Sequence, residues 1–317
     1  MSYEDGWAAL DLKMPKRIPR TEYSATMHWD LMKAVTGMDV GVHSPDEVKK
    51  QAQIAFMRAW NYDFFWSTLI GHAEFGEWQT DMGHAEYAAG GVDRRDTIFS
   101  PFKTAEDVLS FDPWEKLGPK DQAELIERFE AHYRANHEAH PFGVNMTGVY
   151  VTLVSGFIGL FGWDNLLLAA GEDQARFGAL ANRYASWIQQ YFDALAMSTV
   201  PVVMIHDDFV WANGPIFRPA WYRKYIIPNY RKFVTPLRDA GKRVLFCSDG
   251  NFDAFVDDIA AAGFHGFVFE PLTDLRYIVE RYGQTHVIVG NADTRILLYG
   301  SKDDIRGEVK RCMDLGR

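Results

Sequence analysis

The chain has little cysteine, no excess of positive charge and no long apolar run. Its two cysteines, Cys247 and Cys312, are too few for a disulfide framework and favour a reducing, cytoplasmic compartment. A net charge of −10 argues against nucleic acid as a partner. No apolar run approaches the roughly 18 residues of a membrane span, and residues 1–5 lack the basic start of a signal peptide. We therefore expect a soluble, cytoplasmic protein that binds neither nucleic acid nor membrane.

The turns after the expected strands also lack the glycine patterns of phosphate-binding loops. A doubly wound sheet would carry G-x-G-x-x-G or G-x-x-x-x-G-K at such a turn, and neither pattern occurs. Strands and helices nevertheless alternate along the carboxyl-terminal half, which indicates a parallel sheet with right-handed crossovers. We therefore predict an α/β protein with a TIM (β/α)8 barrel, as a single domain over residues 1–317. Residues 1–45 would form an amino-terminal arm and helix packed on the barrel, and the last strand would follow Arg317.

Local signals place the expected elements along the chain. The expected strands cover residues 62–66, 142–148, 200–205, 243–246, 266–269 and 287–290. The expected helices cover residues 21–36, 45–60, 120–140, 219–240, 252–262, 274–282 and 303–315, with further helix starts at 161 and 172 and a break near Pro228. Ser44 is the expected cap of the second helix. Residues 1–20 are expected to be an irregular arm, and the glycine-broken loop at 71–87 to be functional or mobile.

Polar side chains follow each of the last four expected strands. In a barrel such strand ends converge on one mouth, where TIM-barrel enzymes place their active sites. Thiolate, carboxylate and imidazole groups together suit zinc, and Cys247 and Asp249 are spaced so that both can face one side of a strand. A buried cysteine that binds nothing is the alternative interpretation. The strand-end residues are His206, Asp207, Asp208, Cys247, Asp249, Glu270, Asn291 and Asp293.

Asp207 and Asp208 cannot both face the mouth if the strand continues that far. Adjacent strand residues point to opposite faces, so one would face the mouth while the other caps a helix or pairs with a cation such as Arg218. The sequence leaves open which one acts. His28 could line the same pocket from the amino-terminal arm, with a packed or solvated histidine as the alternative.

Several of these segments resemble a known family. The similarity lies in His-Asp-Asp-Phe at 206–209, Gly-Pro-Ile-Phe-Arg-Pro at 214–219, Cys-Ser-Asp-Gly-Asn at 247–251 and Gly-Asn-Ala-Asp at 290–293. The stretch at 162–168 and the arm at 17–20 add to it. The chain resembles the uroporphyrinogen decarboxylase superfamily, and within it the corrinoid- and cobalamin-linked methyltransferases. The resemblance implies a TIM barrel.

The resemblance also implies an altered metal site. Methyltransferases of this superfamily carry zinc on a His-x-Cys-Gly motif, a downstream glutamate and a late cysteine. Here Cys247 and Asp249 stand in place of that histidine and cysteine, Glu270 stands at the glutamate, and Cys312 is a poor substitute for the late cysteine. Cys247, Asp249 and Glu270 are thus the implied metal ligands. This set has more oxygen and less sulfur, and it would hold zinc less tightly.

The leading functional hypothesis is methyl transfer. A methyl group would move between a small methoxylated or methylated compound and a corrinoid on a carrier protein, as in O-demethylation, with a homodimer allowed for as the assembly. The expected catalytic residues are Asp207, Asp208 and Asp249, and the expected substrate-binding residues are His206, His28 and Asn291.

Two other functions stay open. The first is a metal-free decarboxylase of the uroporphyrinogen decarboxylase type, in which an aspartate stabilises a cation or moves a proton. Residues 20–23 read Arg-Thr-Glu-Tyr, where that enzyme has an arginine-rich motif for porphyrinogen carboxylates, which counts against this substrate. The second is a barrel that has lost activity and serves as a binding subunit.

Overall fold

A curved parallel sheet forms the centre of the computed structural model, which describes residues 3–22, 25–81 and 99–316. Its strands are β1 (Phe64–Phe65), β2 (Val144–Asn145), β3 (Thr147–Val149), β4 (Val202–His206), β7 (Arg243–Ser248), β8 (Gly266–Phe269) and β9 (Val287–Val289). β1 pairs with β2, and β3, β4, β7, β8 and β9 pair in that order, all in parallel. A bridge between Ile70 and Val149 continues the first strand alongside β3. The strands therefore follow one another around the sheet in chain order.

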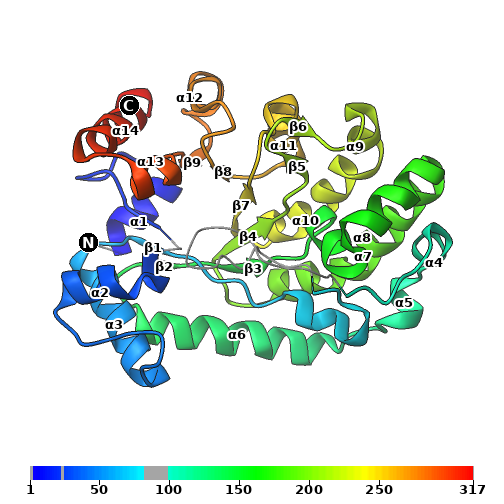
Figure 1. Cartoon of the computed structure of the whole chain (residues 1–317), viewed down its shortest axis with the longest axis horizontal. Helices are drawn as coiled ribbons and strands as arrows, with labels where there is room; N and C mark the ends of the chain where they lie inside the picture. Colours follow the sequence, from blue (N-terminus) through cyan, green and yellow to red (C-terminus); the bar gives the residue numbers. More distant parts are fainter. Residues whose placement is uncertain (1–2, 23–24, 82–98, 317) are drawn as a thin grey trace.

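Helices connect successive strands and cover the outside of the sheet (Figure 1). The connections contain α6 (Gln122–Ala139), α7 (Val154–Glu172), α8 (Gln174–Met197), α9 (Pro219–Tyr225), α10 (Ile227–Asp239), η3 (Asp253–Phe255), α11 (Val256–Ala262) and α12 (Leu275–Tyr282). A short hairpin of β5 (Val210–Trp211) and β6 (Gly214–Pro215) follows β4. Parallel strands in chain order with helical crossovers outside form a TIM barrel, so the predicted fold is confirmed.

The remaining helices lie before, between and after these units. They are α1 (Tyr3–Leu10), η1 (Ala25–Met27), α2 (Trp29–Thr36), α3 (Asp46–Ala59), η2 (His72–Trp78), α4 (Ala105–Leu109), α5 (Pro113–Lys116), α13 (Thr294–Tyr299) and α14 (Lys302–Leu315). The prediction of an irregular arm at residues 1–20 is therefore wrong for its first part, which is helix α1. Helix α13 was also missed.

Helix α1 closes the amino-terminal end of the barrel. Its Leu10 is 3% exposed and packs in one apolar cluster with Val144, Val202, Leu245 and Val287 from four strands. Arg243, the first residue of β7, donates a hydrogen bond to Asp11 just beyond α1 at 2.7 Å. Side chains thus fill the amino-terminal end of the barrel, which leaves the carboxyl-terminal end for a site.

Three predicted helix starts differ from the structure. Pro45, and not Ser44, occupies the cap position of α3, because the Ser44 hydroxyl accepts a hydrogen bond from the Gly41 amide instead. Helix α7 begins at Val154, seven residues before the predicted start. Its backbone is interrupted at Gly162, whose φ of 73° lies in the left-handed region that glycine tolerates, so the prediction found only the second half. Helix α2 begins at Trp29, later than predicted, and ends at Gly37 as predicted.

Helix α7 is long and apolar enough to cross a membrane by length and composition alone. However, 61% of its most apolar window is buried inside this domain. Such burial is typical of a core helix in a soluble protein.

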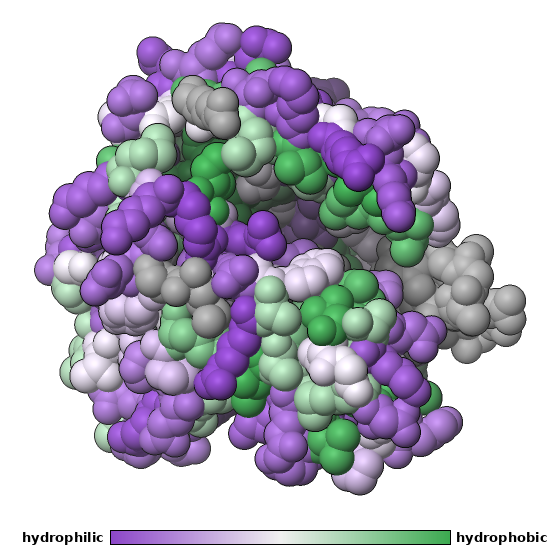
Figure 2. Space-filling model, turned by 90° about the vertical axis from the view of Figure 1, so that its left-hand side faces the viewer, coloured by the Kyte–Doolittle hydropathy of each residue, from purple (hydrophilic) through white to green (hydrophobic). Residues whose placement is uncertain are grey.

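Among the described residues, the five-stranded sheet has β3 at one edge and β9 at the other, and the Ile70–Val149 bridge joins the segment after β1 to the β3 edge. Figure 2 shows that the face on the left-hand side of Figure 1 is hollowed, with hydrophobic residues in the wall and hydrophilic residues around the rim.

Candidate functional site

A cavity of about 500 Å³ lies at the carboxyl-terminal end of the barrel. The strand residues that line it recur at every second position, as expected of side chains that face the barrel interior. The lining consists of Trp66, Ser67, Thr68, Leu69, Gly71, His72, Tyr150, Met204, His206, Cys247, Asp249 and Val268. Three of the predicted site residues, His206, Cys247 and Asp249, are thus brought together. The described lining includes no lysine or arginine.

Strand register explains why these residues meet. His206 on β4 is aligned with Cys247 on β7, and Cys247 with Val268 on β8. Two residues further along, the same register places Asp208, Asp249 and Glu270 at one level. The Asp249 amide donates a hydrogen bond to Asp208 Oδ1 at 2.9 Å, which shows that β4 and β7 stay together beyond their last paired residues.

His206 lies between two hydrogen-bond acceptors. Its Nδ1 is 3.3 Å from the Tyr150 carbonyl oxygen, and its Nε2 is 3.4 Å from Asp208 Oδ1. The Tyr150 ring stacks on the imidazole with centroids 4.2 Å apart, which fixes the ring plane. The Tyr150 carbonyl and the Asp208 carboxylate are both acceptors, so the imidazole can donate a hydrogen bond from either nitrogen.

The neighbouring acids raise one another's pKa. Burial, followed by the charges of Asp249 and Asp208, raises the pKa of Glu270 to about 7. Burial and then Asp208 raise the pKa of Asp249, while His206 opposes the shift. Burial and the same carboxylates raise the pKa of the Cys247 thiol well above its ordinary value. The mouth therefore contains acids that hold protons near neutral pH and a thiol that stays protonated.

Asp207 points away from the cavity and is fully buried. Its Oδ1 accepts a hydrogen bond from the Ser155 amide in the first turn of α7 at 2.7 Å, and its Oδ2 accepts one from the Tyr230 hydroxyl on α10 at 2.6 Å. Burial raises its pKa to about 6, because these donors only partly offset the lost hydration. Asp207 therefore accepts a hydrogen bond from the first turn of α7. Asp208 is not among the lining residues either, but it contacts two of them, His206 and Asp249.

The other predicted residues lie at or beyond the rim. Glu270 directly follows β8, is partly exposed, and is coupled to Asp249 by charge, although it is not among the residues lining the cavity. Asn291 is 2% exposed. Its side-chain nitrogen donates a hydrogen bond to the Thr273 carbonyl oxygen at 2.9 Å, and its side-chain oxygen accepts one from Arg311 at 2.9 Å. His28 is exposed at the start of α2, outside the lining. The structure brings neither Asn291 nor His28 to the cavity.

The predicted metal ligands Cys247, Asp249 and Glu270 are not grouped closely enough, where they stand, to bind one metal ion together. Within the described ranges, no three His, Cys, Asp or Glu side chains are grouped closely enough to hold a metal ion. The donor types suit zinc, but the described geometry of Cys247, Asp249 and Glu270 does not.

Most of the aromatic and polar wall was missed by sequence reasoning. Trp66, Ser67 and His72 come from the segment after β1, and Tyr150 directly follows β3. Tyr150 could have been found by applying the strand-end rule to this earlier strand. His72 lies in the loop predicted to be functional or mobile. Residues 82–87 of that loop are outside the described residues.

Fold and site together define a TIM barrel with a polar cavity at the carboxyl ends of its strands. A model of the uroporphyrinogen decarboxylase (URO-D) family matches residues 99–317, which is more than half of the chain. The chain therefore belongs to the URO-D family, and the predicted superfamily is confirmed.

Individual relatives match over shorter regions. A uroporphyrinogen decarboxylase from Syntrophotalea carbinolica is 29% identical over 149 residues, which cover 47% of this chain and 41% of the relative. A uroporphyrinogen decarboxylase from Xanthomonas campestris is 34% identical over 106 residues, which cover 32% of this chain and 29% of the relative. The match thus spans less than half of the length of these curated relatives.

A solved structure agrees over almost the whole chain. The structure of a methyltransferase from Methanosarcina mazei superposes with a TM-score of 0.64 and covers 98% of this chain and 88% of its own. Its sequence identity is 17%, so the likeness establishes the shared fold.

Proposed function

We propose that this protein transfers a methyl group from a small methoxylated or methylated compound without carboxylates to a reduced corrinoid presented by a carrier protein. One observation carries the proposal: the cavity combines apolar walls with Asp249, a carboxylic acid whose pKa is raised, and its described lining has no lysine or arginine. Such a site suits a substrate without carboxylates, because a carboxylate would meet negative charge and find no bidentate partner.

The residues around the cavity would do three things. Trp66, Leu69 and Met204 would exclude water from the methyl donor. Asp249 would give a proton to the departing oxygen or nitrogen, which needs one when its bond to the methyl carbon breaks. Asp208 would hold Asp249 through the backbone hydrogen bond and share a proton with His206. A corrinoid, when bound, would supply the nucleophile that accepts the methyl group.

A second form of the proposal adds zinc. Cys247, Asp249 and Glu270 lie at or beside the same mouth and have the donor types of a zinc site. These side chains would have to move together, since they are not grouped as ligands where they stand. Elemental analysis of wild type and Cys247→Ser tests this form: about one zinc per chain, lost in the variant, supports it. No zinc above background after growth with zinc excludes it.

Decarboxylation is the second candidate, and the curated relatives favour it because they are uroporphyrinogen decarboxylases. The described cavity disfavours it for a porphyrinogen substrate, whose several carboxylates need cationic partners. The two candidates differ in product, because a decarboxylase releases carbon dioxide and a methyltransferase leaves a demethylated compound.

Two parallel assays separate them. Purified protein would be incubated with cob(I)alamin and a panel of methoxylated aromatics and methylamines, and separately with uroporphyrinogen. We expect donor-dependent loss of cob(I)alamin absorbance with stoichiometric demethylated product. Carbon dioxide release from uroporphyrinogen, without demethylation of any donor, would reverse the assignment. Turnover in neither assay would favour the binding-subunit hypothesis.

A further inference from the structure

The cavity ends at a row of inward-facing residues that crosses five strands. Partners in a parallel ladder point to the same face of the sheet, so the strand register defines the row. It consists of Gly148 on β3, Met204 on β4, Leu245 on β7, Gly266 on β8 and Val287 on β9. Leu245 and Val287 belong to the apolar cluster that fills the amino-terminal end of the barrel, whereas Met204 lines the cavity. Met204 therefore stands at the boundary between the filled part of the barrel and the cavity.

Glycine occupies two positions of this row for steric reasons. A Cβ at Gly148 would lie 1.8 Å from the Met204 carbonyl oxygen, and one at Gly266 would lie 2.4 Å from the Val287 carbonyl oxygen. Atoms cannot approach so closely, so neither position accepts a side chain unless a strand moves. Met204 consequently has no side chain beside it at the aligned position of β3, and it is the residue of the row that a molecule in the cavity would meet.

The distance along the strands limits what the cavity can hold. Leu245 is aligned with Met204, and Asp249 follows Leu245 by four residues, which corresponds to about 13 Å at the rise of a parallel strand. His206 and Cys247 lie between these two positions and also line the cavity. Side chains project into this length from both ends, so the remaining space fits a single ring with a short substituent.

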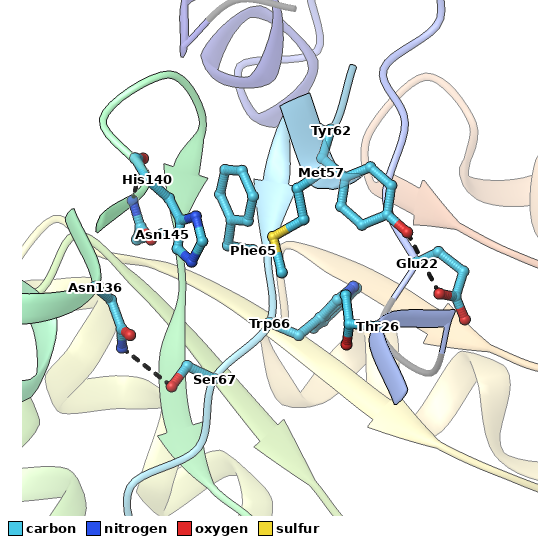
Figure 3. A pocket seen from close by; sticks show the side chains of 10 residues that line it. All are labelled: Glu22, Thr26, Met57, Tyr62, Phe65, Trp66, Ser67, Asn136, His140 and Asn145. Carbon is cyan, nitrogen blue, oxygen red and sulfur yellow. Dashed lines mark hydrogen bonds between the residues drawn. The ribbon is translucent and has the colours of Figure 1, made fainter. Parts of the chain in front are cut away.

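The side walls of the cavity are fixed by contacts of their own. The Tyr150 ring stacks on His206 with centroids 4.2 Å apart. In the wall formed by the segment after β1, Ser67 Oγ lies 2.5 Å from His132 Nε2 and accepts a hydrogen bond from Asn136 at 3.2 Å. Figure 3 shows this bond at the edge of a smaller cavity of about 90 Å³, which Ser67 also lines. These contacts resist widening, so a larger substrate meets its limit at the end of the cavity.

Met204 differs from these walls in being an adaptable side chain. Methionine is unbranched, and its polarizable thioether packs favourably against apolar and aromatic groups. Met204 is 6% exposed and lies on the strand that also carries His206, directly beneath the polar part of the cavity. Its apolar side chain thus faces the end of a bound molecule that is remote from Asp249.

We propose that Met204 sets the depth of the substrate site and that the methyl donor is a compact, monocyclic compound whose apolar end rests on this side chain. The heteroatom that carries the methyl group then lies at Asp249, beside the mouth. This orientation rests on the proposed function, whereas the depth set by Met204 does not. A donor with a longer apolar end has to displace Met204 or withdraw its heteroatom from Asp249.

Equilibrium binding of 4-alkylanisoles, from anisole itself to 4-hexylanisole, tests the depth without turnover. Calorimetric titration of the wild-type protein should show affinity rising about fourfold with each added carbon until the chain reaches Met204. Affinity should then fall by about tenfold, because an overfilled cavity is strained. The measured quantity is the chain length that binds most tightly.

Variants at residue 204 locate the limit. Met204→Ala shortens the side chain, so the tightest binding should move to a chain about two carbons longer. Met204→Leu has nearly the same volume and should restore the wild-type chain length. Met197→Ala, at a side chain that is 69% exposed, is the matched control and should leave the series unchanged.

Thermal unfolding identifies a variant that does not fold. If Met204→Ala is lost in this way, Met204→Val decides, since it removes less volume and should shift the tightest binding in the same direction by about one carbon. The same chain length in wild type and variant overturns the proposal. A series without any maximum, or one that does not bind to the wild-type protein, also overturns it.

The outcomes separate this inference from the proposed function. A maximum that shifts when Met204 is shortened supports the depth limit even if no methyl transfer to cob(I)alamin is found. Methyl transfer from donors whose binding does not respond to replacement of Met204 supports the proposed function and removes Met204 from substrate selection.

Discussion

Asp249 donates its backbone amide to Asp208 Oδ1 at 2.9 Å, so the carboxylate at the end of β4 holds the residue at the end of β7. The charge of Asp208 in turn helps to raise the pKa of the Asp249 side chain. One aspartate thus both positions the other and keeps it protonated at higher pH. This relationship makes Asp249 the residue whose replacement tests the site most directly.

Asp249→Asn should lower the rate of methyl transfer by about 10²- to 10⁴-fold, because an amide of the same size cannot deliver a proton. The affinity for the methyl donor should change much less. Steady-state kinetics with the best donor from the panel would measure both. Asp30→Asn, on the exposed face of α2, is the control and should keep wild-type kinetics. Undiminished turnover of Asp249→Asn would remove Asp249 from catalysis.

Tyr230→Phe should destabilise the fold by about 1–3 kcal/mol, because it leaves the buried Asp207 carboxylate without one of its donors. Urea denaturation at pH 7.5 measures the change in the free energy of unfolding. Tyr299→Phe, at a side chain that is 75% exposed, should change it by less than about 0.5 kcal/mol. A neutral result for Tyr230→Phe would mean that Asp207 does not depend on this contact.

Leu10→Ala should cost about 2–4 kcal/mol of stability, because it opens a cavity at the closed end of the barrel. Met14→Ala is the matched control, since Met14 is 83% exposed just beyond the same helix. Chemical denaturation of both variants makes the comparison. Equal effects would mean that α1 does not fill the barrel.

His265 should make stability depend on pH. Its Nδ1 accepts a hydrogen bond from the Val244 amide at 3.1 Å, and burial, with Arg238 and Arg243, lowers its pKa to about 4. Because the folded-state pKa lies below the ordinary value of about 6.5, this contribution to stability is complete above pH 6.5 and is lost as the pH falls through 4.

Urea denaturation between pH 7.5 and 4 would measure this dependence. Wild type should lose more stability over that range than His265→Phe, which has no proton to bind. His43→Gln, at an exposed histidine, should follow the wild-type curve. Parallel curves for wild type and His265→Phe would contradict the assignment.

The sequence by itself determined the barrel and most of its strands. Apolar runs ending in polar residues marked β4, β7, β8 and β9, and the break between α9 and α10 was expected at Pro228 because proline lacks an amide proton. Local sequence signals failed to predict a helix start that depends on a contact with a residue far along the chain. Helix α7 begins at Val154, where its amides are met by Asp207 from another strand, 52 residues beyond Ser155.

Only the tertiary structure decided which polar residues form the site. Alternation along a strand shows that Asp207 and Asp208 point in opposite directions, but which one faces the cavity depends on how β4 packs against α7 and α10. Asn291 and His28 looked equivalent to His206 in sequence. In the folded protein Asn291 is buried and bonded to Arg311, whereas His28 is exposed to solvent. Trp66 and Tyr150 joined the cavity because parallel strands far apart in the chain end at the same rim, a consequence of barrel closure that no local pattern contains.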